Sequence, residues 1–302
     1  MLAKQSNFWT EAFALHGSAT PRVMPRVLIF GALATLIYWA FHAIPGLHVE
    51  VAPYEAAGAI LTLLLLLRTN SGYDRWWEAR KLWGGIVNQS RNFAITALAY
   101  GPDDEDWRRQ IVGWSAVFPH AARRSLRGER DLPEVAALLG PDAAAELAAA
   151  EHMPSRVAYV LARLLRDAAD SGGLDRFAFL QADKERALLI DHIGACERIL
   201  RTPLPKSYSI KIRRFVLLFL AALPFALLER VGWLTPVITM LVAYPLLSID
   251  EIGVQLQNPF AVERLSHLPL DEISATIERN LKNVAPEAAK RNEARAQPIL
   301  AS

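Results

Sequence analysis

The chain has 302 residues, of which 52% are hydrophobic and 21% are charged, with a formal net charge of +2. A soluble domain of this length usually carries more charge, so the composition favours a membrane protein. The small net charge argues against nucleic-acid binding, which calls for a strongly basic surface. The one cysteine, Cys196, excludes an intrachain disulfide and a zinc site built from several thiolates. The first residues lack a basic region followed by an apolar core, so we expect no cleavable signal peptide.

Hydrophobic residues are concentrated in two zones, and the first of these predicts two membrane helices. Residues 27–49 contain no Lys, Arg, Asp or Glu, and this run is long enough to cross a bilayer. The apolar run 56–67 follows after a short loop, so it can return through the membrane. No proline interrupts the chain between this run and the polar residues after it. We therefore expect one long helix over about 56–100, which leaves the membrane near Arg68.

The second hydrophobic zone predicts two further spans, 215–228 and 231–249, with Pro224 and Pro245 inside them. We expect a tight turn at Glu229, Arg230 and Gly232 between them. Between the zones, residues 101–207 are polar and carry apolar side chains at helical spacing. No stretch alternates apolar and polar residues with a period of two, so we expect no strands. The fold class predicted is an all-α membrane protein with four transmembrane helices and a large cytosolic helical region.

This pattern divides the chain into four segments. Segment 1–100 holds the first two membrane helices, segment 101–207 the cytosolic helices, segment 208–257 the other two membrane helices, and segment 258–302 a cytosolic C-terminal part and tail. Basic residues lie beside the termini and the central region, whereas the short loops hold mostly acids. The positive-inside bias therefore places both termini and the central region in the cytosol. The basic residues in question are Lys4, Arg22, Arg26, Arg68, Arg75, Arg80, Lys81, Lys211, Arg213 and Arg214.

Enzyme motifs are missing from the sequence. It contains no GxSxG, HExxH or GxxxxGK[ST] pattern, and its seven histidines do not pair with carboxylates at ligand spacing. We therefore expect no catalytic residues, no metal site and no cofactor.

The second predicted helix carries a row of residues at a spacing of four, which places them on one slowly drifting face. Two interpretations stay open at this point. Leucine is the default residue of any membrane helix, so the row needs no function. Alternatively, several copies of the chain build a ring, with an apolar collar and acids at its mouth. The row consists of Glu55, Ala59, Leu63 and Leu67, followed by Ser71 and Asp74.

Two polar clusters lie at the ends of predicted spans. The tryptophans of the first cluster, Trp76, Trp77 and Trp83, favour an aromatic belt at the depth of the lipid headgroups. The second cluster, Asp250 and Glu251, places acids where the positive-inside bias expects basic residues. A functional role and a simple contact to Lys or Arg of a neighbouring helix are equally good explanations for these two acids.

Several long motifs resemble the prokaryotic branch of the bestrophin family. The clearest is RTNSGYDRWWEARKLWG at 68–84, which directly follows the apolar run 56–67. The resemblance keeps its order over about residues 8–282. The other motifs that carry it are FALHGS, IGACERILRTPLPKSYSI, LPFALLE, SIDEIGVQLQNPF and LPLDEISATIERNL.

This resemblance implies a homopentameric channel around one central axis. The family's hydrophobic neck falls on Ala59, Leu63 and Leu67, although Ala59 is smaller than the residue expected at the top of the neck. The family's second constriction, a cytosolic aperture, falls in GGLDRFAFL, where Phe177 is the best candidate. The stretch after the last span is poor in acids, so we expect none of the calcium activation of animal members.

The function implied is passage of small monovalent ions across the bacterial inner membrane, gated by dewetting of an apolar ring. Rings of Glu55 and Asp74 would attract cations, so we expect a preference for sodium. The alternative is a chloride channel, as in animal members. A membrane scaffold that binds a cytosolic regulator is an alternative of another class. The partners expected are further copies of the chain, monovalent ions and the lipid bilayer.

Overall fold

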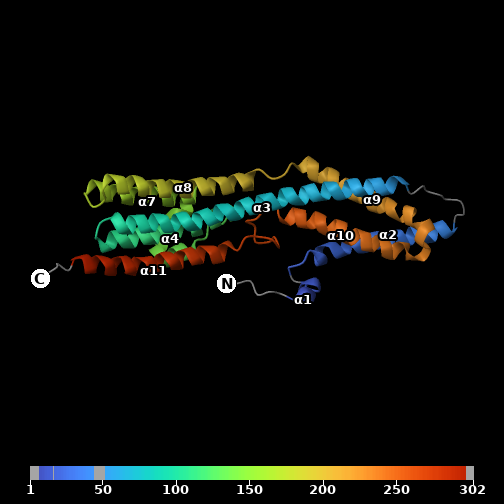
Figure 1. The fold of residues 1–302 in the computed structure, drawn as a ribbon, viewed down its shortest axis with the longest axis horizontal. Helices are drawn as coiled ribbons and strands as arrows, with labels where there is room; N and C mark the ends of the chain where they lie inside the picture. The colour runs from blue at the N-terminus through green and yellow to red at the C-terminus, as the bar shows by residue number, and fades with distance from the viewer. Residues whose placement is uncertain (1–6, 16, 44–51, 297–302) are drawn as a thin grey trace. The chain divides into compact units, whose positions relative to one another are not determined.

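The computed structural model describes residues 7–15, 17–43 and 52–296. Every regular element within these ranges is a helix (Figure 1). The elements are α1 (Phe8–Ala12), α2 (Thr20–Ala43), α3 (Ala52–Tyr100), α4 (Glu105–Arg127), α5 (Pro133–Leu139), α6 (Pro141–Ala149), α7 (Met153–Asp170), α8 (Arg176–Arg201), α9 (Lys206–Val231), the 3₁₀ turn η1 (Gly232–Leu234), α10 (Thr235–Gln255) and α11 (Leu270–Ala296). The all-α prediction is confirmed for these ranges.

The long helix predicted after the first span is confirmed as α3, which runs for 49 residues. Its only proline, Pro53, lies in the first turn, where the missing N–H disturbs no helical hydrogen bond. The helix that precedes α3 begins earlier than the charge-free run does. The Ser18 hydroxyl accepts a hydrogen bond from the Thr20 backbone N–H at 3.1 Å, which supports an early start of α2.

The turn between α9 and α10 includes Gly232, as the sequence predicts, but α10 begins later than expected. Helix α9 continues to Val231, and the chain turns at Gly232, whose φ of 54° is a conformation that glycine adopts without strain. Helix α10 therefore starts at Thr235, and the start predicted for this span at residue 231 is wrong. Both helices continue through their internal prolines, Pro224 and Pro245.

The chain folds into two compact units. The first comprises residues 1–76 and 203–267, and it contains α2, the beginning of α3, α9 and α10 (Figure 1). Gly31 of α2 allows a close approach to α10, because a Cβ atom there would lie 2.6 Å from the Met240 sulfur. The buried core of this unit consists of Val23, Val27, Phe30, Leu61, Leu65, Ile212, Val216, Leu220, Leu223, Ala243 and Leu247.

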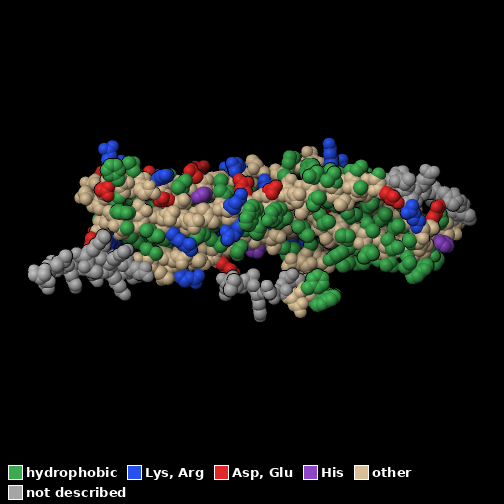
Figure 2. Space-filling view, viewed as in Figure 1, with side chains coloured by type: hydrophobic (Ala, Val, Ile, Leu, Met, Phe, Trp, Pro, Cys, Tyr) green, Lys and Arg blue, Asp and Glu red, His purple; other side chains and the backbone are tan. Residues whose placement is uncertain are grey.

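The first unit also exposes many hydrophobic side chains. Hydrophobic side chains dominate the face of its helices seen in Figure 2. Helix α2 and the stretch Lys206–Gln255, which holds α9 and α10, are long and apolar enough to cross a membrane. The apolar part of α3 is too short to meet the same standard on its own.

The second unit comprises residues 77–202 and 268–302. Asp104 caps the start of α4 by accepting the Trp107 backbone N–H at 2.8 Å, and Gly128 ends it in the left-handed conformation. Gly85 of α3 lies against His192 of α8, since a Cβ atom there would lie 2.5 Å from the imidazole. The largest buried side chains of this unit are Trp83, Ile86, Phe93, Ile111, Phe118, Leu147, Met153 and Leu161.

Candidate functional site

Helix α3 presents two opposite faces in the first unit. The side chains of Leu61 and Leu65 are buried in the core. At roughly 100° of rotation per residue, the row Ala59, Leu63 and Leu67 points about 180° away from them. Leu63 is 56% exposed and Leu67 is 49% exposed. The predicted neck residues thus share a face that no described part of the chain covers.

Exposure by itself does not single out the neck. Ile60 and Leu66, which flank the row on the helix surface, are also exposed. An apolar surface of this kind suits either lipid or other copies of the chain. The structure therefore brings Ala59, Leu63 and Leu67 together on one free stripe but does not distinguish a pore from a lipid-facing surface.

The two acids of the row differ in their surroundings. Glu55, at the start of α3, is exposed, and its carboxylate lies 3.5 Å from the guanidinium of Arg230 at the end of α9. Asp74 is exposed on the same stripe as the neck residues. The sequence did not predict the Arg230 partner, which offsets part of the negative charge expected from Glu55.

A buried ion pair fixes the orientation of α3. The guanidinium of Arg68, the residue after Leu67, donates to Asp250 of α10, and the two side chains are only 1% and 5% exposed. Arg213 of α9 also donates to Asp250, at 3.1 Å. Because a buried charge without a partner is costly, these contacts fasten α3 to α9 and α10. Any rotation of α3 would separate Arg68 from its carboxylate.

Glu251 forms a second set of contacts beside the first. Its carboxylate lies 3.4 Å from Arg26 and 3.8 Å from Arg22, both on α2. Gln255 donates to it at 2.5 Å and in turn accepts the backbone N–H of Leu265 at 3.2 Å. Of the two explanations for the acids at the end of α10, contact to basic residues of neighbouring helices is confirmed.

The tryptophans after the neck do not form one belt. The indole N–H of Trp76 donates to the Ser266 carbonyl at 2.7 Å, so a contact within the first unit holds this side chain. Trp83 is fully buried in the second unit. The interpretation of Trp83 as a headgroup anchor is therefore wrong, because the same polar-to-apolar pattern also describes a helix that enters a folded core.

Phe177, the candidate for the cytosolic aperture, lies in the first turn of α8 and is 84% exposed. The Asp175 carboxylate caps this turn by accepting the backbone N–H groups of Phe177 at 2.8 Å and Ala178 at 3.1 Å. Leu180, one turn further, is exposed too. The cap holds the backbone that carries two apolar side chains outward.

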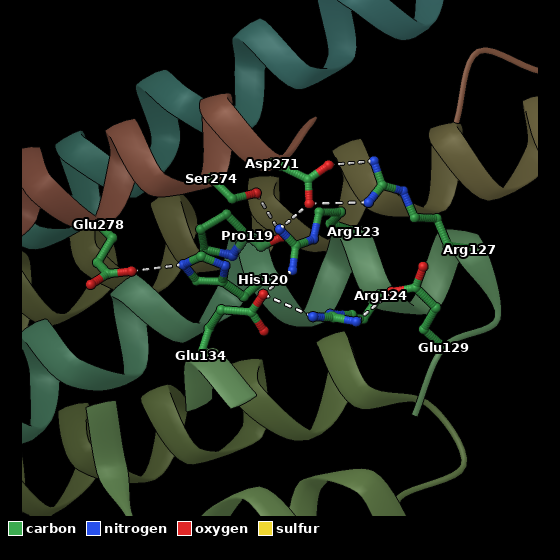
Figure 3. Close-up of polar contacts among 10 residues, drawn as sticks. All are labelled: Pro119, His120, Arg123, Arg124, Arg127, Glu129, Glu134, Asp271, Ser274 and Glu278. Atoms are coloured by element: carbon green, nitrogen blue, oxygen red, sulfur yellow. Dashed lines mark hydrogen bonds and ion pairs between the residues drawn. The ribbon is translucent and has the colours of Figure 1, made fainter. Parts of the chain in front are cut away.

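Figure 3 shows a charged network on α4, which sequence patterns did not predict. Arg123 donates to Asp271 of α11 at 2.6 Å and to Glu134 of α5 at 2.5 Å, while Arg124 reaches Glu134 at 2.9 Å and Arg127 reaches Asp271 at 2.8 Å. This α4 network fastens α5 and α11 to α4.

Hydrogen bonding decides the protonation of the acids in this network. Burial by itself would raise the pKa of Glu134, but the hydrogen bonds from Arg124 and Arg123 outweigh it and lower this pKa to about 2. The hydrogen bond from Arg127 lowers the pKa of Asp271. His120, whose Nε2 lies 2.9 Å from Glu278 of α11, has its pKa lowered by burial.

The described residues offer no cluster of three or more His, Cys, Asp or Glu side chains that could hold a metal ion. The thiol of Cys196 is buried, and this burial raises its pKa to about 12, so it is unreactive.

Comparison with known proteins identifies the family. Residues 1–283 match the model of the bacterial and fungal bestrophin proteins. A voltage-dependent anion channel-forming protein of Ralstonia nicotianae is 33% identical over 294 residues, which cover 95% of each chain. A protein of the same name from Nostoc sp. is 32% identical over 291 residues, or 94% of each chain.

A solved structure agrees with these relatives. The crystal structure of a bacterial bestrophin homologue from Klebsiella pneumoniae superposes with a TM-score of 0.82 at 27% identity, and the match covers 87% of this chain and 98% of that one. The family and these relatives are ion channels and not enzymes. The protein described here is an all-α membrane protein that belongs to the bestrophin family.

Proposed function

We propose that five copies of this chain form an ion channel, with α3 of each copy lining one central pore. The observation that carries this proposal is the free apolar stripe of α3, which lies opposite a face fixed by core packing and by the Arg68–Asp250 pair. In a ring of five, Ala59, Leu63 and Leu67 would form a hydrophobic neck. Water leaves a narrow apolar ring easily, and an ion cannot pass without its hydration shell.

The proposed topology follows the charge bias. Helices α2, α9, α10 and the beginning of α3 cross the bacterial inner membrane, so segments 1–100 and 208–257 carry four crossings. Segments 101–207 and 258–302 and both termini lie in the cytosol. Phe177 would surround the cytosolic aperture, since the capped first turn of α8 holds it outward.

We propose that calcium does not activate this channel. The two acids at the end of α10 already have arginine partners, because Asp250 accepts from Arg68 and Arg213 and Glu251 lies beside Arg22 and Arg26. Carboxylates engaged in this way are poor candidates for a calcium site, which needs several oxygen ligands.

Two selectivities are supported by different observations. The exposed carboxylate of Asp74, on the stripe of the neck, favours monovalent cations such as sodium, with Glu55 at the other end of the stripe. The names of the relatives favour anions, and so does the pairing of Glu55 with Arg230. We propose a cation preference, with an anion channel as the alternative.

A planar bilayer experiment tests both whether the protein conducts ions and which ions it prefers. Purified protein should give currents whose reversal potential across a sodium chloride gradient lies near the sodium equilibrium potential. A value near the chloride equilibrium potential would replace the cation channel by the anion channel. If neither currents nor liposome flux appear from assembled protein, the channel itself is rejected in favour of a membrane scaffold.

A further inference from the structure

A pocket of about 400 Å³ lies among α2, α9 and α10 of the first unit. This volume falls within the range of small-molecule sites in proteins. One end of the pocket is charged and the remainder is apolar. The charged end is lined by Arg26, Arg213 and Asp250, and the apolar part by Ile29, Phe30, Val216, Leu217 and Leu247.

The charged end lies where the helices change from polar to apolar sequence. Arg26 directly precedes the charge-free run 27–49, and Arg213 closely precedes the apolar run 215–228. Ile29 and Leu217, about one turn further along each helix, are exposed. In a bilayer, such a boundary lies at the depth of the lipid headgroups, and the exposed apolar residues lie at the depth of the acyl chains.

Positive charge is in excess at this end of the pocket. Four guanidinium groups surround the two carboxylates of Asp250 and Glu251, and they belong to Arg22, Arg26, Arg68 and Arg213. The side chains of Arg26 and Arg213 are 50% and 51% exposed. Since a guanidinium carries five N–H donors, both can bind a further acceptor while they keep their carboxylate partners.

We propose that this pocket binds an anionic phospholipid. Its phosphate group would lie between Arg26 and Arg213, and one acyl chain would cover Ile29 and Leu217. A free phosphate ion would leave the apolar part of the pocket empty. A zwitterionic lipid would bring an ammonium group to a site that already has excess positive charge, so charge complementarity selects an anionic headgroup.

Native mass spectrometry of the purified, assembled protein tests this proposal through titration with phosphatidylglycerol and with phosphatidylcholine. We expect tighter binding of phosphatidylglycerol. Arg213→Gln should weaken that binding about fivefold, which is the equivalent of the ~1 kcal/mol by which one basic residue attracts an anionic lipid surface. Arg214→Gln is the matched control. The Arg214 side chain is next in sequence to Arg213 but does not line the pocket, so this variant should leave the affinity unchanged.

A second pair of variants keeps the test valid if Arg213→Gln fails to fold. Leu217→Trp fills the apolar part of the pocket and removes no member of an ion pair, and Leu218→Trp adds the same bulk to an exposed position outside it. Only Leu217→Trp should reduce phosphatidylglycerol binding.

Several results would overturn the proposal. These are equal affinity for both lipids, equal losses in Arg213→Gln and Arg214→Gln, equal losses in Leu217→Trp and Leu218→Trp, and full competition by inorganic phosphate, which would reveal a simple anion site. A change of subunit number in Leu217→Trp, with lipid binding unchanged, would also overturn it, since a second copy of the chain would then cover the pocket.

Discussion

Both faces of α3 in the first unit carry leucine side chains, but one face is buried in the core and the opposite face is exposed. Leu61 and Leu65 are buried, and Arg68 continues their face into a buried ion pair. Leu63 and Leu67 are about half exposed on the opposite face. A leucine run on a membrane helix therefore has no single role, because the packing of neighbouring helices decides which leucines stabilise the fold and which stay exposed.

The largest effect is expected from Arg68→Met, which leaves Asp250 buried without its main partner. Removal of one member of a buried pair costs about 3–5 kcal/mol, so we expect a large loss of stability. Thermal unfolding in detergent, followed by tryptophan fluorescence, measures it. The double variant Arg68→Met with Asp250→Leu should recover much of the loss. Failure to recover would mean that Arg68 acts through contacts other than this pair.

Leu65→Ala and Leu63→Ala compare the two faces directly. Leu65→Ala creates a cavity in the core and should cost about 2–5 kcal/mol of unfolding free energy. Leu63→Ala removes an exposed side chain and should cost less than half as much. Equal losses in the same thermal assay would show that Leu63 is buried in the assembled protein, with a structural role of its own.

Conductance measurements test whether the exposed face of α3 lines the pore. Leu63→Ala should widen and wet the proposed neck, and we expect single-channel conductance in planar bilayers to rise severalfold. Leu66→Ala, at an exposed position that flanks the neck row, serves as the control and should leave conductance near that of the unmodified protein. Unchanged currents in Leu63→Ala would count against this residue as the barrier.

The smallest loss of stability is expected from the α4 network, which is partly exposed, in contrast to the buried Arg68–Asp250 pair. The pKa of Glu134 is lowered from 4.5 to about 2 in the folded chain, so its contribution is complete above pH 4.5 and is lost as the pH falls toward 2. Because the group is partly solvated, we expect a loss on the order of 1–2 kcal/mol. Unfolding measured at pH 6 and pH 3 tests this, and Glu134→Gln should flatten that part of the pH dependence. An unaltered pH profile in this variant would assign the acid sensitivity to other groups.

Much of the fold could be predicted because helices follow from local patterns. The charge-free run that forms α2 and the uninterrupted stretch that forms α3 are properties of neighbouring residues. The start of α10 was placed too early because helix boundaries depend on capping, and α9 continues to Val231 before the chain turns at Gly232.

Only part of the candidate site could be predicted from the sequence. The spacing of Ala59, Leu63 and Leu67 placed them on one face, and α3 has that geometry. The arginine partners of Asp250 and Glu251 were one of two open explanations. The burial of Trp83 was missed, because a tryptophan beside charged residues fits a membrane interface and a protein core equally well.

Local patterns in the sequence are enough to predict the helical class, the two hydrophobic zones, the shared helix face of Ala59, Leu63 and Leu67, and the motifs that resemble the bestrophin family. The tertiary structure alone decided which face of α3 is buried, that Arg68 meets Asp250 across 182 residues of chain, and that Arg230 lies beside Glu55. The physical reason is that hydrophobic periodicity is written locally, whereas the partner of a charged side chain depends on which distant segments pack together.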